Sequence, residues 1–167
     1  MDALGIGDGS VVADLGAGSG WFTIRLTTRV GPNGTVFAED IQQPMIQAIN
    51  VRVESLGIKN VHTVLGTQSD PRLPVPVDAV LIVDAYHEME QPVTLLRNVA
   101  KSLKPTGRIG IVNFTKDGGG PGPAMEERVD PERVISDAQA AGLTLRSRET
   151  FLKYEYMLVF EKRIPRP

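Results

Sequence analysis

Residues 12–21, which read VADLGAGSGW, place three glycines at alternate positions directly behind an apolar run. Glycine lacks a side chain, so a loop built on Gly16, Gly18 and Gly20 allows its backbone to approach a ligand closely. An acidic residue, Asp14, stands just ahead of these glycines. The stretch therefore predicts a ligand-binding loop that begins where an apolar strand ends.

The spacing of these glycines argues against two common phosphate-binding motifs. A phosphate loop of the nucleoside-triphosphatase type needs a lysine after its last glycine, and no lysine follows Gly20. The dinucleotide fingerprint G-x-G-x-x-G, counted from Gly16, would need its last glycine where Trp21 stands. An indole ring at that position prevents the close helix–strand packing that the fingerprint requires.

The elements that must position this loop alternate between short β-branched runs and helical patterns, which is typical of a parallel sheet with crossover helices. Helices are expected from Ser19, after Pro44, after Pro92, and over 130–142, where Asp130 is a good N-cap. The last two strands read as a hairpin. The expected strands are 10–15, 35–41, 60–66, 77–86, 108–114, 143–150 and 154–162.

Composition limits the classes of function that this chain can serve. The 167 residues suit a single domain, 1–167, and include 18 basic and 20 acidic side chains, which argues against a broad nucleic-acid surface. The absence of cysteine excludes disulfides, thiolate catalysis and cysteine zinc sites. Neither a signal peptide nor a membrane-spanning run is recognisable, so we expect a cytoplasmic protein with no membrane partner.

The acid-plus-glycine pattern Asp14, Gly16, Gly18, Gly20 resembles motif I of the class I S-adenosylmethionine-dependent methyltransferases. The stretch 103–112, LKPTGRIGIV, is similar to the turn that precedes the fifth strand in that family. The likeness is greatest to compact bacterial enzymes related to quinone-biosynthesis methyltransferases. It implies an α/β fold with a Rossmann-like, doubly wound seven-stranded sheet. That sheet is mostly parallel with an antiparallel last strand and carries helices on both faces.

The same resemblance implies S-adenosylmethionine as cofactor and S-adenosylhomocysteine as product. The loop residues Gly16, Ala17, Gly18 and Gly20 would lie against the amino-acid half of the cofactor. Asp14 would help to hold its ammonium group, since a zwitterion favours a carboxylate near its positive end.

The family also places an acidic residue at the end of the second strand, where it binds both ribose hydroxyls. Glu39 and Asp40 are both available there, and strand alternation predicts that only one of them faces the site. We choose Asp40, because the hydrophobic residue that follows it, Ile41, would lie on the adenine. Met45 would contact the same edge.

The adenine side departs from the family pattern. Many relatives place an aspartate directly after the glycine of the third strand, but Gly66 is followed by Thr67 and Gln68, and Asp70 comes later. The contact to the adenine amino group is therefore expected from Thr67, Gln68 or the backbone.

Candidate catalytic residues lie in 83–92, VDAYHEMEQP, after the fourth strand. Asp84, Tyr86 and His87 are expected at the cleft mouth, with Asp84 beside the cofactor and Tyr86 and His87 near the acceptor. A base is needed only if the acceptor must lose a proton early, and a histidine has a suitable pKa for that role. The alternative is that His87 merely orders the loop.

A metal-assisted reaction of the kind that catechol-type O-methyltransferases carry out would use Asp84, Asn113 and Asp117 here. One firm carboxylate with an amide is a weak magnesium site, so no metal is expected. The glycine- and proline-rich segment 115–127 is interpreted as a flexible lid, and 163–167 as a frayed tail.

The resemblance implies methyl transfer to a small-molecule acceptor, and no nucleic-acid partner is expected. Two alternatives stay open: an RNA or protein methyltransferase, which would need a basic face, and a catalytically silent cofactor-binding module acting in a complex. Only about ten residues precede the first strand. The substrate face is therefore either open, trimmed of a lid, or closed by a partner chain such as a second copy in a homodimer.

Overall fold

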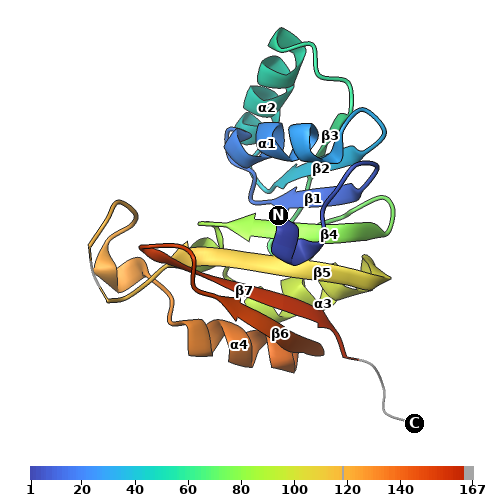
Figure 1. Ribbon diagram of the computed structural model, residues 1–167. Helices are drawn as coiled ribbons and strands as arrows, with labels where there is room; N and C mark the ends of the chain where they lie inside the picture. The colour runs from blue at the N-terminus through green and yellow to red at the C-terminus, as the bar shows by residue number, and fades with distance from the viewer. Residues whose placement is uncertain (118, 164–167) are drawn as a thin grey trace.

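The computed structural model describes residues 1–117 and 119–163. A seven-stranded sheet in the order β3-β2-β1-β4-β5-β7-β6 runs through these residues (Figure 1). All neighbouring strands pair in parallel except β7, which runs antiparallel to both β5 and β6. The predicted sheet is confirmed. Its strands are β1 (Val11–Leu15), β2 (Thr35–Asp40), β3 (Val61–Leu65), β4 (Val77–Val83), β5 (Leu103–Phe114), β6 (Leu143–Glu149) and β7 (Glu155–Lys162).

Helices cover both faces of the sheet. On one face, α1 (Trp21–Val30) and the short 3-10 turn η1 (Asp2–Leu4) bury Leu26, Val30 and Leu4 in one apolar cluster. On the other face, α3 (Pro92–Lys101) and α4 (Pro131–Ala140) pack side by side in a second cluster. The helix α2 (Gln43–Ser55) contacts β2 and β3. Two further 3-10 turns are η2 (Tyr86–Glu88) and η3 (Met125–Glu127).

The order of the strands reverses beside β1, which continues to β2 on one side and to β4 on the other. Leu15, the last residue of β1, is level with Glu39 of β2 and with Ile82 of β4. The carboxyl ends of the three strands therefore meet at one edge of the sheet. In open α/β sheets this is where ligands bind.

The strand β4 lies in the middle of the sheet. Five of its seven residues are buried, as expected of a central strand covered on both faces. The pairing of β4 with β5 changes register between Val77 and Ala79 of β4, which pair with Leu103 and Arg108 of β5. The extra residues on β5 are those of the LKPTG stretch.

Two expected boundaries differ from the structure. The fourth strand ends at Val83 and not at residue 86, because Asp84 adopts a left-handed conformation with a φ of 51°. The fifth strand begins at Leu103, five residues before the expected start. The predicted frayed tail, apart from Arg163, lies outside the described residues. None of the helices in the described ranges is long and apolar enough to cross a membrane.

Candidate functional site

A pocket of about 390 Å³ lies at the carboxyl ends of β1, β2 and β4. Most of the residues predicted to hold the cofactor line it, and they come from the glycine loop, the end of β2, the start of α2 and the segments after β3 and β4. The lining residues are Gly16, Gly18, Glu39, Asp40, Ile41, Gln42, Met45, Thr67, Gln68, Asp84, Ala85, Glu88, Met89 and Leu95.

The glycine loop needs glycine for two different reasons. Gly16 has a φ of +68°, and a Cβ there would lie 2.5 Å from the Cβ of Ala85, so the loop packs directly on the segment after β4. Gly18 has a φ of +54°, but a Cβ there would meet no atom within 4 Å. The first glycine therefore allows close packing within the protein, whereas the second borders open space in the pocket.

Asp40 fastens this loop to α2. Its Oδ2 accepts a hydrogen bond from the Gly18 N–H at 2.9 Å, and its Oδ1 accepts one from the Gln42 N–H at 2.9 Å. The carboxylate thus lies between the glycine loop and the N-terminus of a helix, and it also lines the pocket.

The prediction that only one of Glu39 and Asp40 faces the site is wrong, because both line the pocket. The longer glutamate side chain reaches the Gly16 N–H, which donates to Glu39 Oε2 at 3.3 Å. Gly66 leaves the room for it, since a Cβ at Gly66 would lie 1.7 Å from Glu39 Oε1. The pKa of Glu39 is raised to about 8, mainly because the carboxyl group is buried. The hydrogen bond from Gly16 lowers the pKa in part, and the charges of Asp40 and Asp14 raise it further.

Asp14, Ala17 and Gly20 support the loop from behind and do not line the pocket. Asp14 is buried beneath it and accepts a hydrogen bond from Thr23 Oγ1 at 2.7 Å. Burial raises the pKa of Asp14 to about 6. The Ala17 N–H donates to the Glu39 carbonyl and the Gly20 N–H to the Ala17 carbonyl, both at 2.9 Å, so these residues set the shape of the loop.

Ile41, Met45, Thr67 and Gln68 line the pocket together, as predicted for the adenine side. Ile41 is 44% exposed, although it is a large apolar residue, which leaves its face available to a ligand. Asp70 folds back on Thr67: its N–H donates to Thr67 Oγ1 at 3.0 Å, and the Thr67 N–H donates to its carbonyl at 2.9 Å. Asp70 therefore stabilises this turn.

Tyr86 does not lie at the pocket, and we withdraw it as a catalytic candidate. Its side chain belongs to the core cluster under α3 and α4, and its hydroxyl donates to Asp137 Oδ2 at 2.9 Å. Burial and the Asp137 carboxylate raise the pKa of this phenol far above its usual value. Chain direction after β4 changes at the left-handed Asp84, so alternation along the expected strand could not predict where Tyr86 points.

His87 lines a second pocket, of about 660 Å³, and not the first. Its Nε2 lies 3.6 Å from Glu88 Oε1, and Glu88 lines both pockets. The other walls come from the segment after β5 and the start of α4. His87 is thus beside the candidate cofactor pocket and not within it.

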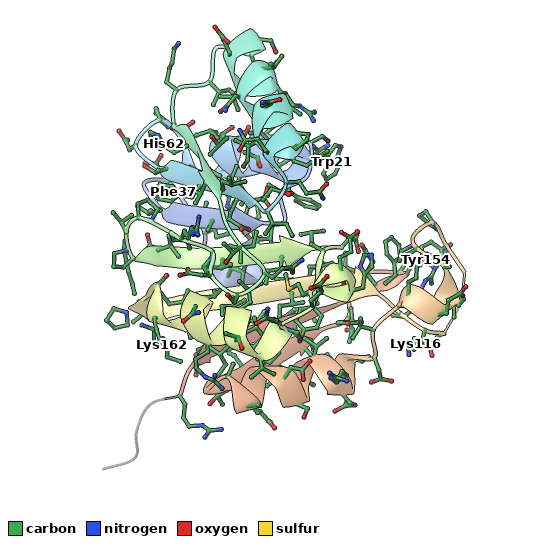
Figure 2. The ribbon with its side chains drawn as sticks, turned by 180° about the vertical axis from the view of Figure 1, so that it is seen from behind. Trp21, Phe37, His62, Lys116, Tyr154 and Lys162 are labelled. Carbon is green, nitrogen blue, oxygen red and sulfur yellow. The ribbon has the colours of Figure 1, made fainter. Side chains whose placement is uncertain are left out.

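The described part of the segment 115–127, which was predicted to be a lid, forms an arm that projects beyond the sheet, where Figure 2 shows Lys116 and Tyr154. Arg128 holds the described part of this arm from within. Its guanidinium is buried and donates to the carbonyl oxygens of Thr115 at 3.0 Å and Pro123 at 3.1 Å. Movement of the arm stays a prediction.

The pocket lining carries four carboxyl groups, those of Glu39, Asp40, Asp84 and Glu88, and no lysine, arginine or histidine. Burial, followed by the charge and hydrogen bonding of Glu155, raises the pKa of Asp84 to about 7. Such a pocket favours a cationic ligand and disfavours a phosphate. Among the described residues, no three histidine, aspartate or glutamate side chains are grouped so that they could hold a metal ion.

Five lining residues were not predicted from the sequence: Gln42, Ala85, Glu88, Met89 and Leu95. Ala85, Glu88 and Met89 fall in the stretch 83–92, which was predicted to carry the catalytic residues. Their position directly after β4 could therefore have indicated that they line the pocket. Leu95 gave no such signal, because its spacing in α3 is that of an ordinary core residue.

Residues 6–155 match the family described as a methyltransferase domain, and the chain therefore belongs to this family. The predicted resemblance to class I S-adenosylmethionine-dependent methyltransferases, and to quinone-biosynthesis enzymes among them, is confirmed.

The chain is 32% identical over 120 residues to the ubiquinone/menaquinone biosynthesis C-methyltransferase of Pasteurella multocida (strain Pm70), covering 70% of this chain and 44% of that protein. It is 31% identical over 137 residues to the nocamycin O-methyltransferase of Saccharothrix syringae, covering 80% of this chain and 47% of that protein. The chain thus spans about half the length of these curated relatives.

A solved structure, an S-adenosylmethionine-dependent methyltransferase from Aquifex aeolicus, superposes with a TM-score of 0.88 at 26% identity. The match covers 95% of this chain and 85% of that one, so the likeness extends over the whole sheet and its helices.

Proposed function

We propose that this chain binds S-adenosylmethionine and transfers its methyl group to a small-molecule acceptor, leaving S-adenosylhomocysteine. The observation that carries the proposal is the acidic pocket beside the glycine loop, with four carboxyl groups and no basic side chain in its lining. S-adenosylmethionine carries a positive sulfonium and a positive ammonium group, which this lining attracts. A dinucleotide would bring a pyrophosphate, for which this lining offers no basic side chain.

The residues present fit the parts of the cofactor. Asp40 would accept hydrogen bonds from the ribose hydroxyls, because its carboxylate lines the pocket at the end of β2. Ile41 and Met45 would flank the adenine ring, with Thr67 and Gln68 beside its polar edge. Gly18 would leave room for the amino-acid half. When bound, the cofactor supplies an electrophilic methyl group; the protein positions the reactants and excludes water.

For the acceptor, we propose the second pocket, which shares Glu88 with the first. Its volume of about 660 Å³ suits a small molecule. The names of the two curated relatives, a quinone-biosynthesis C-methyltransferase and a nocamycin O-methyltransferase, support an acceptor of low molecular weight. His87 remains the candidate base on this side, since it lines this pocket.

The test is an assay with S-adenosylmethionine labelled in its methyl group, offered in parallel with a panel of small hydroxylated and amino compounds, with RNA and with protein. We expect label in a small molecule and stoichiometric S-adenosylhomocysteine. Label in RNA or protein would contradict the small-molecule acceptor. If the protein binds the cofactor but transfers its methyl group to no small molecule, RNA or protein, the result would favour a catalytically silent cofactor-binding module.

A further inference from the structure

Asp84 stands where the chain leaves β4 and turns toward the glycine loop. Its φ of 51° is a left-handed conformation that a residue with a side chain rarely adopts, and strain of this kind is concentrated at functional sites. Its N–H donates to the Val112 carbonyl at 2.9 Å, which fixes the turn to β5. The next residue, Ala85, packs against Gly16. The carboxyl group of Asp84 is thereby held in the wall of the cofactor pocket.

The surroundings of this carboxyl group are polar but incompletely paired. Asp84 Oδ1 is buried without a hydrogen-bond partner in the part of the chain that the structure describes, and so are both amide atoms of Asn113. Buried polar atoms are nearly always paired, so a group of unpaired atoms at the ends of β4 and β5 marks a site for a ligand or an ion.

The ionisable groups around Asp84 are almost all acidic. Glu155 and Tyr156 face it from β7, Glu88 lines the pocket from η2, and Glu39 and Asp40 line it from β2. Burial is the largest cause that raises the pKa of Asp84 to about 7, and the charge and hydrogen bonding of Glu155 raise it further.

The strand order indicates which part of the cofactor Asp84 meets. The ribose site proposed above lies at the end of β2, and the pocket extends from there over β1 to Asp84 at the end of β4. The sulfur atom links the ribose to the amino-acid chain. The end of the pocket away from Asp40 therefore receives the sulfur and the amino-acid half.

Resting on the proposed function, we propose that Asp84 is the counter-charge for the sulfonium of S-adenosylmethionine and distinguishes it from S-adenosylhomocysteine. Below neutral pH the charged cofactor displaces a proton from Asp84 into the solvent. After methyl transfer the sulfur is neutral, Asp84 takes a proton back from the solvent, and the product is held without a charge contact. Glu155 is a positioning residue, because it acts through Asp84.

The test is calorimetric titration of both ligands into the wild-type protein, Asp84→Asn and Glu155→Gln, at about pH 6 and about pH 8. In the wild type, affinity for S-adenosylmethionine rises with pH and about one proton is released at the lower pH, whereas S-adenosylhomocysteine binding changes less. Asp84→Asn weakens S-adenosylmethionine binding roughly tenfold or more and leaves the product within about twofold. Asp78→Asn, at the opposite end of β4, is the matched control and leaves the ratio unchanged.

Glu155→Gln keeps the size of the side chain but removes its charge, so the rise in S-adenosylmethionine affinity moves to lower pH. This shift and the wild-type proton release test the proposal even if Asp84→Asn does not fold. Equal weakening of both ligands by Asp84→Asn would overturn it, because Asp84 would then hold the ammonium group that both share. Unchanged affinities would overturn it too. Failure of the wild type to bind either ligand would instead contradict the proposed function itself.

Discussion

The carboxylate of Asp40 accepts two backbone hydrogen bonds: one of its oxygens holds the glycine loop at Gly18, and the other holds the start of α2 at Gln42. Glu39, its neighbour, holds the same loop one residue earlier, at Gly16. Both acids therefore belong to the site. Substituting each in turn shows how much each contributes to ligand binding.

We predict that Asp40→Ala weakens binding of S-adenosylhomocysteine by about 1.5–3 kcal/mol, because charge-assisted hydrogen bonds to the ribose are lost. Calorimetry measures this directly, with Glu39→Gln as the matched comparison. A larger loss for Glu39→Gln, with Asp40→Ala unchanged, would assign the ribose to Glu39.

For Tyr86 we predict an effect on stability and none on ligand binding, because its hydroxyl forms a hydrogen bond within the core. Removing its hydrogen bond to the buried Asp137 with Tyr86→Phe should lower the free energy of unfolding by about 1–3 kcal/mol. Affinity for the cofactor should not change. Urea denaturation and calorimetry on the same sample check both points, and a loss of affinity at unaltered stability would restore Tyr86 to the site.

At the scale of elements, the sequence predicted the strands, the glycine loop and the acid at the end of β2 well, because apolar runs and glycine spacing are local signals. It failed where side-chain direction depends on a turn whose conformation no pattern reveals. The left-handed Asp84 turned Tyr86 into the core, and Gly66 made room for Glu39 to reach the loop. Both effects arise from contacts between segments far apart in the sequence.

The packing of the loop on the segment after β4 gives a prediction at this scale. Gly16→Ala and Gly57→Ala both place a side chain at a positive φ, +68° and +65°, which costs about 1–2 kcal/mol each. Only at Gly16 does the new Cβ also collide, at 2.5 Å from Ala85. Gly16→Ala should therefore be the more destabilising by roughly 1 kcal/mol or more in urea denaturation. Equal losses would show that the loop adjusts freely.

For the whole molecule, the buried acids of the pocket link stability to pH. Asp14, Glu39 and Asp84 have pKa values raised to about 6, 8 and 7, so each is neutral in the folded protein where it would be charged in the unfolded chain. The unfolded chain binds fewer protons in this range, and the stability that these groups contribute is lost as pH rises.

We therefore predict that the melting temperature of the ligand-free protein falls between about pH 4 and about pH 8. Asp14→Asn should flatten this decline up to about pH 6, and Glu39→Gln should flatten it up to about pH 8. Melting curves over this range provide the check. A melting temperature that rises steadily with pH would mean that these carboxyl groups are ionised in the folded state.

The central claim is that an acidic pocket beside the glycine loop takes a sulfonium nucleoside and not a dinucleotide. Calorimetric titration of the protein with S-adenosylmethionine, S-adenosylhomocysteine and NAD tests it most directly. The account predicts saturable binding of the first two with one site per chain and no heat of binding for NAD. Binding of NAD with no binding of either S-adenosyl compound would contradict it.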